Sequence, residues 1–145
     1  MSDLEIRLAT SEEDVLKVLV VRGIVFIEEQ EVDWEGEIDE FEKTATHFLG
    51  EVGGQPVATG RLRFFEDGWV KVERIAVRPR RRGKGYAREI VAFMLDHATA
   101  QGAKKFKMHA QVYLEEFYTG FGFRREGPIF DECGIDHIYM VREDD

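Results

Sequence analysis

The sequence predicts a single α/β domain built on a mixed, mostly antiparallel sheet. Its 145 residues, 43% of them hydrophobic, suit one domain with one core. Turn signals predict three antiparallel strands between two amphipathic helices, and three further strands with a helical turn follow the second helix. We find neither an internal repeat nor a linker, so we expect residues 1–145 to fold as one unit.

The N-terminal part predicts a strand over 5–8 and a helix over 12–29. Thr10 and Ser11 can cap this helix, and three acidic residues in its first turn favour the positive end of the helix dipole. Beyond the helix, Gly53-Gly54 joins two segments that predict a hairpin, and a second turn leads to a third strand. These three predicted strands cover 47–52, 57–65 and 69–77.

The C-terminal part begins where Pro79 ends the third strand. A basic loop up to Gly85 opens the second helix, whose apolar residues from Ala87 to Ala98 fall on one face, and Gly102 is its natural stop. The remaining predicted elements are a strand over 106–110, a helical turn over 114–119, and strands over 123–126 and 137–142.

Charge is distributed unevenly along the chain. Twenty Lys and Arg against 29 Asp and Glu give a net charge of −9, which argues against nucleic acid or an anionic membrane as a partner. Residues 28–42 hold nine carboxylates and no base, and we expect a solvated lip there, with attraction of a cationic acceptor as the alternative. Residues 78–84 hold five positive charges and no acid, which predicts contact with an anionic ligand.

Composition also limits the compartment and the cofactors. The single cysteine, Cys133, argues against a disulfide framework, and no His, Cys, Asp or Glu set has metal-ligand spacing, so we expect no metal. The N-terminal segment is polar and acidic, and no stretch of about 18 apolar residues occurs. We therefore expect a cytoplasmic protein without membrane contact.

The segment 80–85, Arg-Arg-Arg-Gly-Lys-Gly, lies between a predicted strand and a predicted helix. Free backbone N–H groups and the helix dipole make such a place an anion site, and glycines allow close approach to a phosphate. Its spacing differs from the nucleotide triphosphatase and dinucleotide-binding motifs. The alternative is a basic surface turn without a ligand.

The flanking residues show a family resemblance. Arg80, Gly83 and Gly85 after the strand 73–77, together with the segment 117–123, Phe-Tyr-Thr-Gly-Phe-Gly-Phe, resemble the two signatures of the GCN5-related N-acetyltransferase (GNAT) superfamily. The resemblance covers nearly the whole chain. Segments around 22–30, 38–47 and 134–140 resemble the ElaA/YjcF-like group, and the chain also looks related to glyphosate N-acetyltransferase.

This resemblance implies a sheet with helices on both faces, split by a V-shaped cleft that binds acetyl-CoA as acyl donor to an amine. It places the pantetheine arm along Ile75, Ala76 and Val77, where a backbone N–H can polarise the thioester carbonyl. The other implied cofactor-binding residues form the phosphate loop and the start of the helix: Arg80, Arg82, Gly83, Lys84, Gly85, Tyr86 and Ala87.

The catalytic candidates are His137, Glu73 and Tyr118. An amine must lose a proton before it attacks, and the resemblance assigns this base to His137, with Glu73 as the second choice. A structural role at a strand end is the alternative for His137. Strand alternation groups Glu73 with Ile75 and Val77 unless a bulge intervenes. The resemblance implies that Tyr118 assists the departing thiolate, and packing alone is its alternative.

The candidate acceptor-binding residues are Arg22, Arg74, His47 and Gln111. Arg22 and Arg74 fall where the glyphosate-acetylating relative holds an anionic substrate, but Gln111 stands at the third such position, which puts a dianionic acceptor in doubt. Arg22 could instead pair with Glu28 or Glu29 on its helix. His47 could line the acceptor pocket or form a structural hydrogen bond.

The predicted function is transfer of the acetyl group of acetyl-CoA to the primary amine of a small molecule. Two alternatives stay open: a non-catalytic module that binds acyl-CoA, because a fold does not guarantee a reaction, and an enzyme that acts on peptides or proteins. Dimers are common in such folds, which leaves a homodimer open by analogy.

Overall fold

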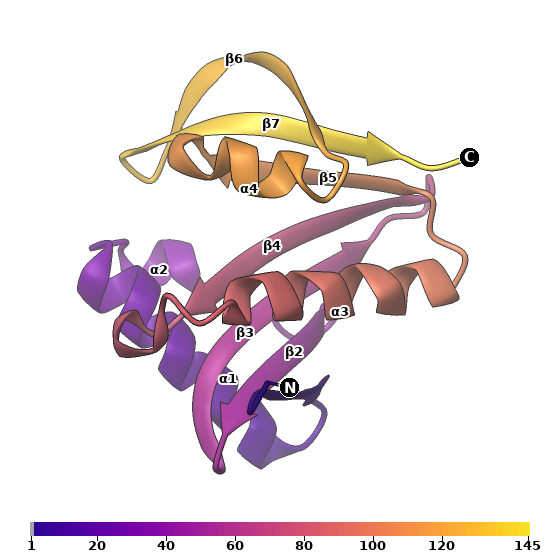
Figure 1. Cartoon of the computed structure of the whole chain (residues 1–145). Coiled ribbons are helices and arrows are strands. Elements are labelled where there is room, and N and C mark those ends of the chain that lie inside the picture. Colours follow the sequence, from indigo (N-terminus) through magenta and orange to yellow (C-terminus); the bar gives the residue numbers. More distant parts are fainter. Residues whose placement is uncertain (1) are drawn as a thin grey trace.

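The computed structural model describes residues 2–145 and contains one seven-stranded sheet with helices on both faces (Figure 1). In chain order the elements are β1 (Glu5–Leu8), α1 (Glu12–Arg22), the π-helix η1 (Gly23–Glu29), α2 (Trp34–Glu37), β2 (Thr46–Val52), β3 (Gln55–Phe64), β4 (Trp69–Val77), the 3-10 turn η2 (Pro79–Arg81), α3 (Tyr86–Ala100), β5 (Lys105–Gln111), the 3-10 turn η3 (Val112–Leu114), α4 (Glu115–Thr119), β6 (Arg124–Glu132) and β7 (Ile135–Glu143).

The sheet has the strand order β1-β2-β3-β4-β5-β7-β6. Every neighbouring pair is antiparallel except β4 and β5, which run parallel. The expected mixed, mostly antiparallel sheet is therefore confirmed.

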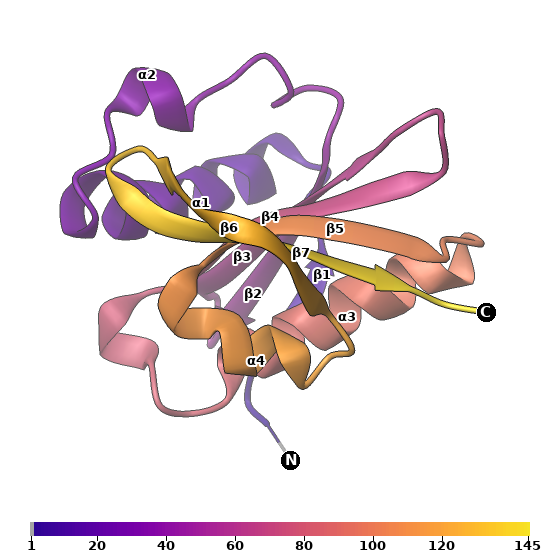
Figure 2. The same cartoon turned by 90° about the horizontal axis from the view of Figure 1, so that it is seen from above.

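Helices α1 and α3 cover opposite faces of the sheet (Figure 2). Val21 of α1 and Val25 of η1 pack against Ala76 of β4 in one small cluster. On the other face, α3 contributes residues such as Ile90 and Met94 to the main core. Every strand other than β6 also contributes residues to this core. No helix within residues 2–145 is long and apolar enough to cross a membrane.

A bulge in β4 changes which side chains face the two helices. Arg61 of β3 pairs with Glu73, but Thr59 pairs with Ala76, so one extra residue of β4 is accommodated near Arg74. Arg74, at this position, has the left-handed backbone angle φ 55°. Glu73 and Ala76 thus lie on the face of the sheet that α1 covers. Strand alternation grouped Glu73 with Ile75 and Val77 unless a bulge intervened, and this bulge is present.

The parallel pair β4 and β5 separates soon after it starts. Their backbones pair only from Trp69 to Lys71 with 105–107, and the two strands then diverge, as Figure 1 shows. Side chains from both strands line a cleft of about 590 Å³ beyond this point. The split sheet expected from the family resemblance is present, and its divergence leaves backbone groups of β4 without a strand partner on the cleft side.

Three segments differ from the sequence prediction. The first helix extends over 12–29 as expected, but its last seven residues are π-helical. The acidic run contains the short helix α2. Strand β6 reaches Glu132 rather than residue 126, because it arches away from β7 at 127–129 and then pairs again at Phe130. Gly127-Pro128 in the sequence suggested an end to the strand, and only the sheet shows that pairing resumes.

Candidate active site

The loop between β4 and α3 has the form of an anion site. Gly83 and Gly85 both adopt φ 84°, a conformation that is strained for residues with a Cβ. Gly85 caps α3 and, within the described residues, no side chain caps this end. The N–H groups of the first helical turn are therefore free to bind an anion, and the helix dipole favours negative charge here.

A small pocket of about 200 Å³ lies at this helix start. Arg82, Gly83, Gly85, Tyr86 and Ala87 line it, whereas Arg80 and Lys84 are exposed and line neither this pocket nor the large cleft. Arg82 is fixed in place, because its Nε donates to the Val77 carbonyl at 3.0 Å and its Nη atoms pair with Glu29.

The large cleft continues from this pocket. Val77, Arg82, Ala87 and Phe117 line both, which connects the helix start to the space between β4 and β5. Ile75, Ala76 and Val77 lie in the β4 wall of this cleft, and residues 108–111 of β5 form the opposite wall. A ligand that enters both cavities would have one end at the helix start and the rest between β4 and β5.

Tyr118 of α4 lies at the cleft with its ring in the core. The ring meets Phe117 and Phe123 edge to face, which fixes its orientation. Burial raises the pKa of Tyr118 well above its usual range. The hydroxyl therefore keeps its proton and can donate a hydrogen bond to an anion in the cleft.

His137 of β7 lies on the other side of the cleft and is 7% exposed. Its Nδ1 is 2.7 Å from the Ile135 carbonyl, which can only accept a hydrogen bond, so the proton of the neutral ring is assigned to Nδ1. Phe130 stacks on the ring at 6.0 Å between centroids. The lone pair on Nε2 is consequently free to take a proton.

Glu73 lines the cleft but is bound by cations. It pairs with Arg61 and Arg63, and Lys71 lies 3.8 Å away. Burial alone would raise the pKa of Glu73, but the charge and hydrogen bonds of the arginines outweigh it and lower the pKa. Because its pKa is lowered, the Glu73 carboxylate binds a proton weakly. Glu73, the second choice for the base, is therefore poorly suited to that role.

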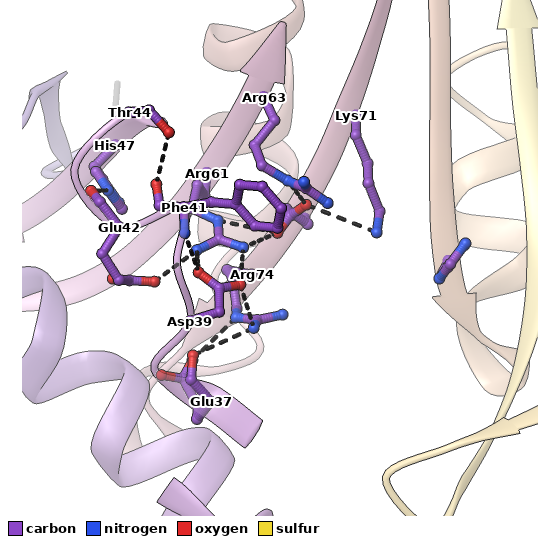
Figure 3. A network of polar contacts seen from close by, with 12 residues as sticks. Glu37, Asp39, Phe41, Glu42, Thr44, His47, Arg61, Arg63, Lys71 and Arg74 are labelled. Atoms are coloured by element: carbon purple, nitrogen blue, oxygen red, sulfur yellow. Dashed lines mark hydrogen bonds and ion pairs between the residues drawn. The ribbon is translucent and has the colours of Figure 1, made fainter. Parts of the chain in front are cut away.

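The acidic run was expected to be a solvated lip, and for part of it this is wrong. Glu37, Asp39 and Glu42 turn inward onto Arg22 and Arg61, which are each 1% exposed. Figure 3 shows Asp39 and Glu42 beside Arg61, and Glu37 beside Arg74. Arg61 donates to Asp39 at 2.7 and 2.8 Å and to Glu42 at 2.6 Å. These ion pairs hold the segment 37–42 against the sheet next to the cleft, an arrangement that local sequence composition does not reveal.

Arg22 and His47 do not line the cleft. The guanidinium of Arg22 donates to Glu37 at 2.7 and 2.8 Å and to Glu42 at 2.7 and 2.9 Å, so it is not available to an anionic acceptor in this structure. The alternative expectation, that Arg22 pairs with Glu28 or Glu29 on its own helix, is also wrong, because its partners are Glu37 and Glu42. His47 donates from Nε2 to the Glu42 carbonyl at 2.8 Å and has the structural role that was its alternative.

Arg74 and Gln111 do line the cleft, from opposite walls. Nη2 of Arg74 donates to the Glu37 carbonyl at 3.2 Å and to Asp39 at 3.3 Å, and Nε lies 3.2 Å from a Glu37 oxygen without hydrogen-bond geometry. Gln111 donates from Nε2 to Gln30 at 3.1 Å, which ties β5 to the residue that follows η1. Arg74 thus has a guanidinium edge at the cleft, while its other donors help to hold the acidic segment.

Comparison with known proteins identifies this architecture. Residues 11–143 match the family described as acetyltransferase (GNAT) domain. The chain is 35% identical over 137 residues to the uncharacterized N-acetyltransferase YjcF of Bacillus subtilis, covering 94% of this chain and 97% of that protein. The chain belongs to the GNAT acetyltransferase family.

Solved structures with a similar fold include two bacterial proteins. The crystal structure of Escherichia coli ElaA superposes with a TM-score of 0.88 at 28% identity, covering 97% of this chain and 99% of that chain. A Bacillus subtilis acetyltransferase solved in complex with CoA has a TM-score of 0.73 at 16% identity, with 97% and 98% covered. The ElaA/YjcF-like group inferred from the sequence is thus confirmed.

Sequence reasoning missed two groups of this GNAT site. Arg61 is the centre of the buried ion network, but an arginine within a predicted strand carries no motif. His109 and Glu132 line the cleft on either side of His137, and the one signal for them in the sequence is a histidine within the predicted strand 106–110. Both groups are formed by residues that only the folded sheet brings together.

Proposed function

We propose that the protein is an N-acetyltransferase that transfers the acetyl group of acetyl-CoA to the primary amine of a small molecule. The observation that carries this proposal is the single cleft that Tyr118 and His137 both line, continuous with an anion site at the start of α3. A proton acceptor for the amine and a phenol that can assist the departing thiolate suit this reaction.

The residues present suit acetyl-CoA as the donor substrate. The first turn of α3 with Gly83 and Gly85 would bind the pyrophosphate, and the unpaired edge of Ile75 and Val77 would hydrogen-bond the pantetheine amides. The solved acetyltransferase–CoA complex with the same fold supports this assignment. When bound, acetyl-CoA supplies an activated acyl group as its thioester.

The chain's own groups would handle the protons. His137 Nε2 takes a proton from the acceptor ammonium, and the resulting amine forms the new N–C bond as the C–S bond breaks. The electron pair of that bond leaves on sulfur, where the Tyr118 hydroxyl donates a hydrogen bond, and the second proton that the nitrogen loses on becoming an amide passes to this thiolate to give the free thiol of CoA. Holding both substrates in one cleft supplies much of the rate through orientation. Because the cleft of about 590 Å³ must also hold the pantetheine arm, a small acceptor suits the space that is left.

The test measures CoA-thiol release from acetyl-CoA over a panel of amines grouped by charge. A blank without acceptor corrects for Cys133, which is exposed and reacts with thiol reagents. Release above the blank with at least one amine supports the proposal. Saturable binding of acetyl-CoA with no release from any amine would instead indicate a binding module.

Two variants separate catalysis from cofactor binding. His137→Ala should lower turnover by roughly a hundredfold and leave acetyl-CoA affinity nearly unchanged. Gly83→Val should abolish acetyl-CoA binding, because Val cannot readily adopt φ 84° in the anion loop. Gly68→Val is the matched control, since Gly68 has φ 92° in the turn before β4, far from the loop along that strand. Full turnover in His137→Ala between pH 6 and 9 would exclude His137 as the base.

A further inference from the structure

Glu132 differs from the other carboxylates that line the cleft. Within residues 2–145 four carboxylates do so: Glu37, Asp39, Glu73 and Glu132. The first three each have an arginine partner. Glu132 alone has neither an arginine nor a lysine in contact, and its neighbours are two histidines. Its charge is therefore the one in this cleft that a cationic ligand could still pair with.

A tight hairpin fixes the direction of Glu132. Cys133 and Gly134 form the two-residue turn between β6 and β7, and both have the positive φ angles, 54° and 78°, typical of such turns. Glu132 pairs with Ile135, and Phe130 pairs with His137. Residues paired in this way share one face of the sheet, so Glu132 and His137 both point into the cleft.

His109 of β5, on the other side of β7 from β6, holds the Glu132 side chain. Its Nδ1 lies 2.9 Å from Glu132 Oε1, and because a carboxylate only accepts, the ring donates. This hydrogen bond lowers the pKa of Glu132, so the carboxylate is charged at neutral pH. Phe130 packs edge to face on His109 at 5.1 Å and limits its rotation. One oxygen of Glu132 is thus occupied and the other remains free.

The free oxygen, Oε2, lies 3.6 Å from Nε2 of His137. Nε2 carries a lone pair in the neutral ring, so these two atoms have no hydrogen between them and share no hydrogen bond. A nitrogen placed about 2.9 Å from each would form a triangle with this 3.6 Å base and donate to both atoms. A primary ammonium group has the charge and the several N–H donors for this position.

We propose that Glu132, held by His109, docks the ammonium group of the acceptor beside His137. This inference rests on the proposed function and adds the recognition of the amine to it. The carboxylate binds the cation, one N–H points at Nε2, and that proton moves to His137. The amine then attacks the thioester, the C–S bond breaks with its electron pair on sulfur, and the second proton lost by the nitrogen passes to that thiolate. The imidazolium that remains is paired with Glu132 until its proton returns to water.

The test compares cationic and neutral nucleophiles in Glu132→Gln. For primary alkylamines, which are charged at pH 7, we expect the acceptor KM to rise roughly tenfold or more, because a charged hydrogen bond is lost. For methoxyamine, which is uncharged at pH 7, the acceptor KM should change less than twofold. The KM for acetyl-CoA should be unchanged with both. This split identifies loss of the charge, since general damage to the cleft would affect both nucleophiles.

Two further variants complete the design. His109→Asn should raise the alkylamine KM in the same direction, and the double variant with Glu132→Gln should be no worse than Glu132→Gln alone, because His109 acts through Glu132. Glu126→Gln is the matched control on the same strand, since Glu126 is exposed, pairs with Arg124 and does not line the cleft. It should leave both KM values unchanged.

The outcomes separate this inference from the proposed function. An equal alkylamine KM in wild type and Glu132→Gln overturns the docking role while acetyl transfer stands. If wild type acetylates no amine, the proposed function fails, and ethylammonium binding followed by the NMR signals of the His137 ring decides the docking role. Perturbation in wild type but not in Glu132→Gln supports docking, and the same result in both proteins overturns it.

Discussion

Surroundings decide which single residues of the cleft can carry out proton chemistry. Tyr118 keeps its proton because burial opposes a phenolate, and Glu73 keeps its charge because two arginines bind it. His137 keeps a lone pair on Nε2 because its other nitrogen is committed to a carbonyl. The family resemblance made both His137 and Glu73 candidates for the base, and the neighbours distinguish them.

Tyr118→Phe tests the role of the phenol. The ring contacts with Phe117 and Phe123 persist in this variant, so the melting temperature should change little. We expect kcat to fall by roughly tenfold to a hundredfold, because the thiolate loses its hydrogen-bond donor. The KM for acetyl-CoA should stay within about twofold of wild type. Steady-state kinetics with one amine measures both values, and an unchanged kcat would leave Tyr118 with a packing role only.

Among the elements, β4 and its bulge determine the shape of the site. The extra residue near Arg74 turns Glu73 towards the ion network and leaves Ile75 and Val77 for the cleft wall. On β3, Gly60 lies opposite this bulge, where a Cβ would be 2.3 Å from Sδ of Met94 on α3. The absence of a side chain at Gly60 therefore permits the close packing of α3 on the bulged part of the sheet.

Gly60→Ala should lower the free energy of unfolding by about 1–3 kcal/mol, because Met94 is fully buried and must move. In the double variant with Met94→Ala, the new methyl group partly fills the space left by Met94, so the combined loss should be smaller than the sum of the single losses. Urea unfolding measures all three variants. Gly23→Ala is the control, since Gly23 has a helical φ of −62° and open space at its Cβ position. Additive losses would show that Gly60 and Met94 do not share this contact.

For the whole molecule, sequence predicted the order of elements but not the contacts between distant segments. Periodicity and turn residues located the helices and strands, and Gly83, Gly85 and Tyr118 identified the family because their motifs are local. The bulge at Arg74 was not predictable, since no glycine marks it. Nor was the inward turn of the acidic segment, because Arg22 pairs with a carboxylate 15 residues away and Arg61 with one 22 residues away. Such pairs depend on the register of the folded sheet.

Arg61 is the centre of the network that joins the acidic segment to the sheet, and its removal should affect the stability of the molecule as a whole. Arg61→Met leaves Asp39 and Glu73 without their main cation, and we expect a loss of about 3–5 kcal/mol in the free energy of unfolding at pH 7. Arg124→Met is the control, because Arg124 forms exposed pairs and its loss should cost less than about 1 kcal/mol.

The loss should also depend on pH in a defined direction. Burial alone would raise the pKa values of Asp39 and Glu73, but Arg61 outweighs it and lowers them below their ordinary 3.8 and 4.5. A lowered pKa in the folded protein stabilises it above the ordinary value, and this contribution disappears as the pH falls towards the folded pKa. In Arg61→Met, Glu73 keeps only Arg63 and Lys71, and Asp39 keeps only Arg74, so burial opposes fewer cations and the two pKa values are lowered less. The difference between wild type and variant, measured by urea unfolding, should therefore be largest above about pH 5 and shrink towards pH 3.5. A difference that stays constant over this range would mean that Arg61 stabilises the fold through its packing and not through its charge.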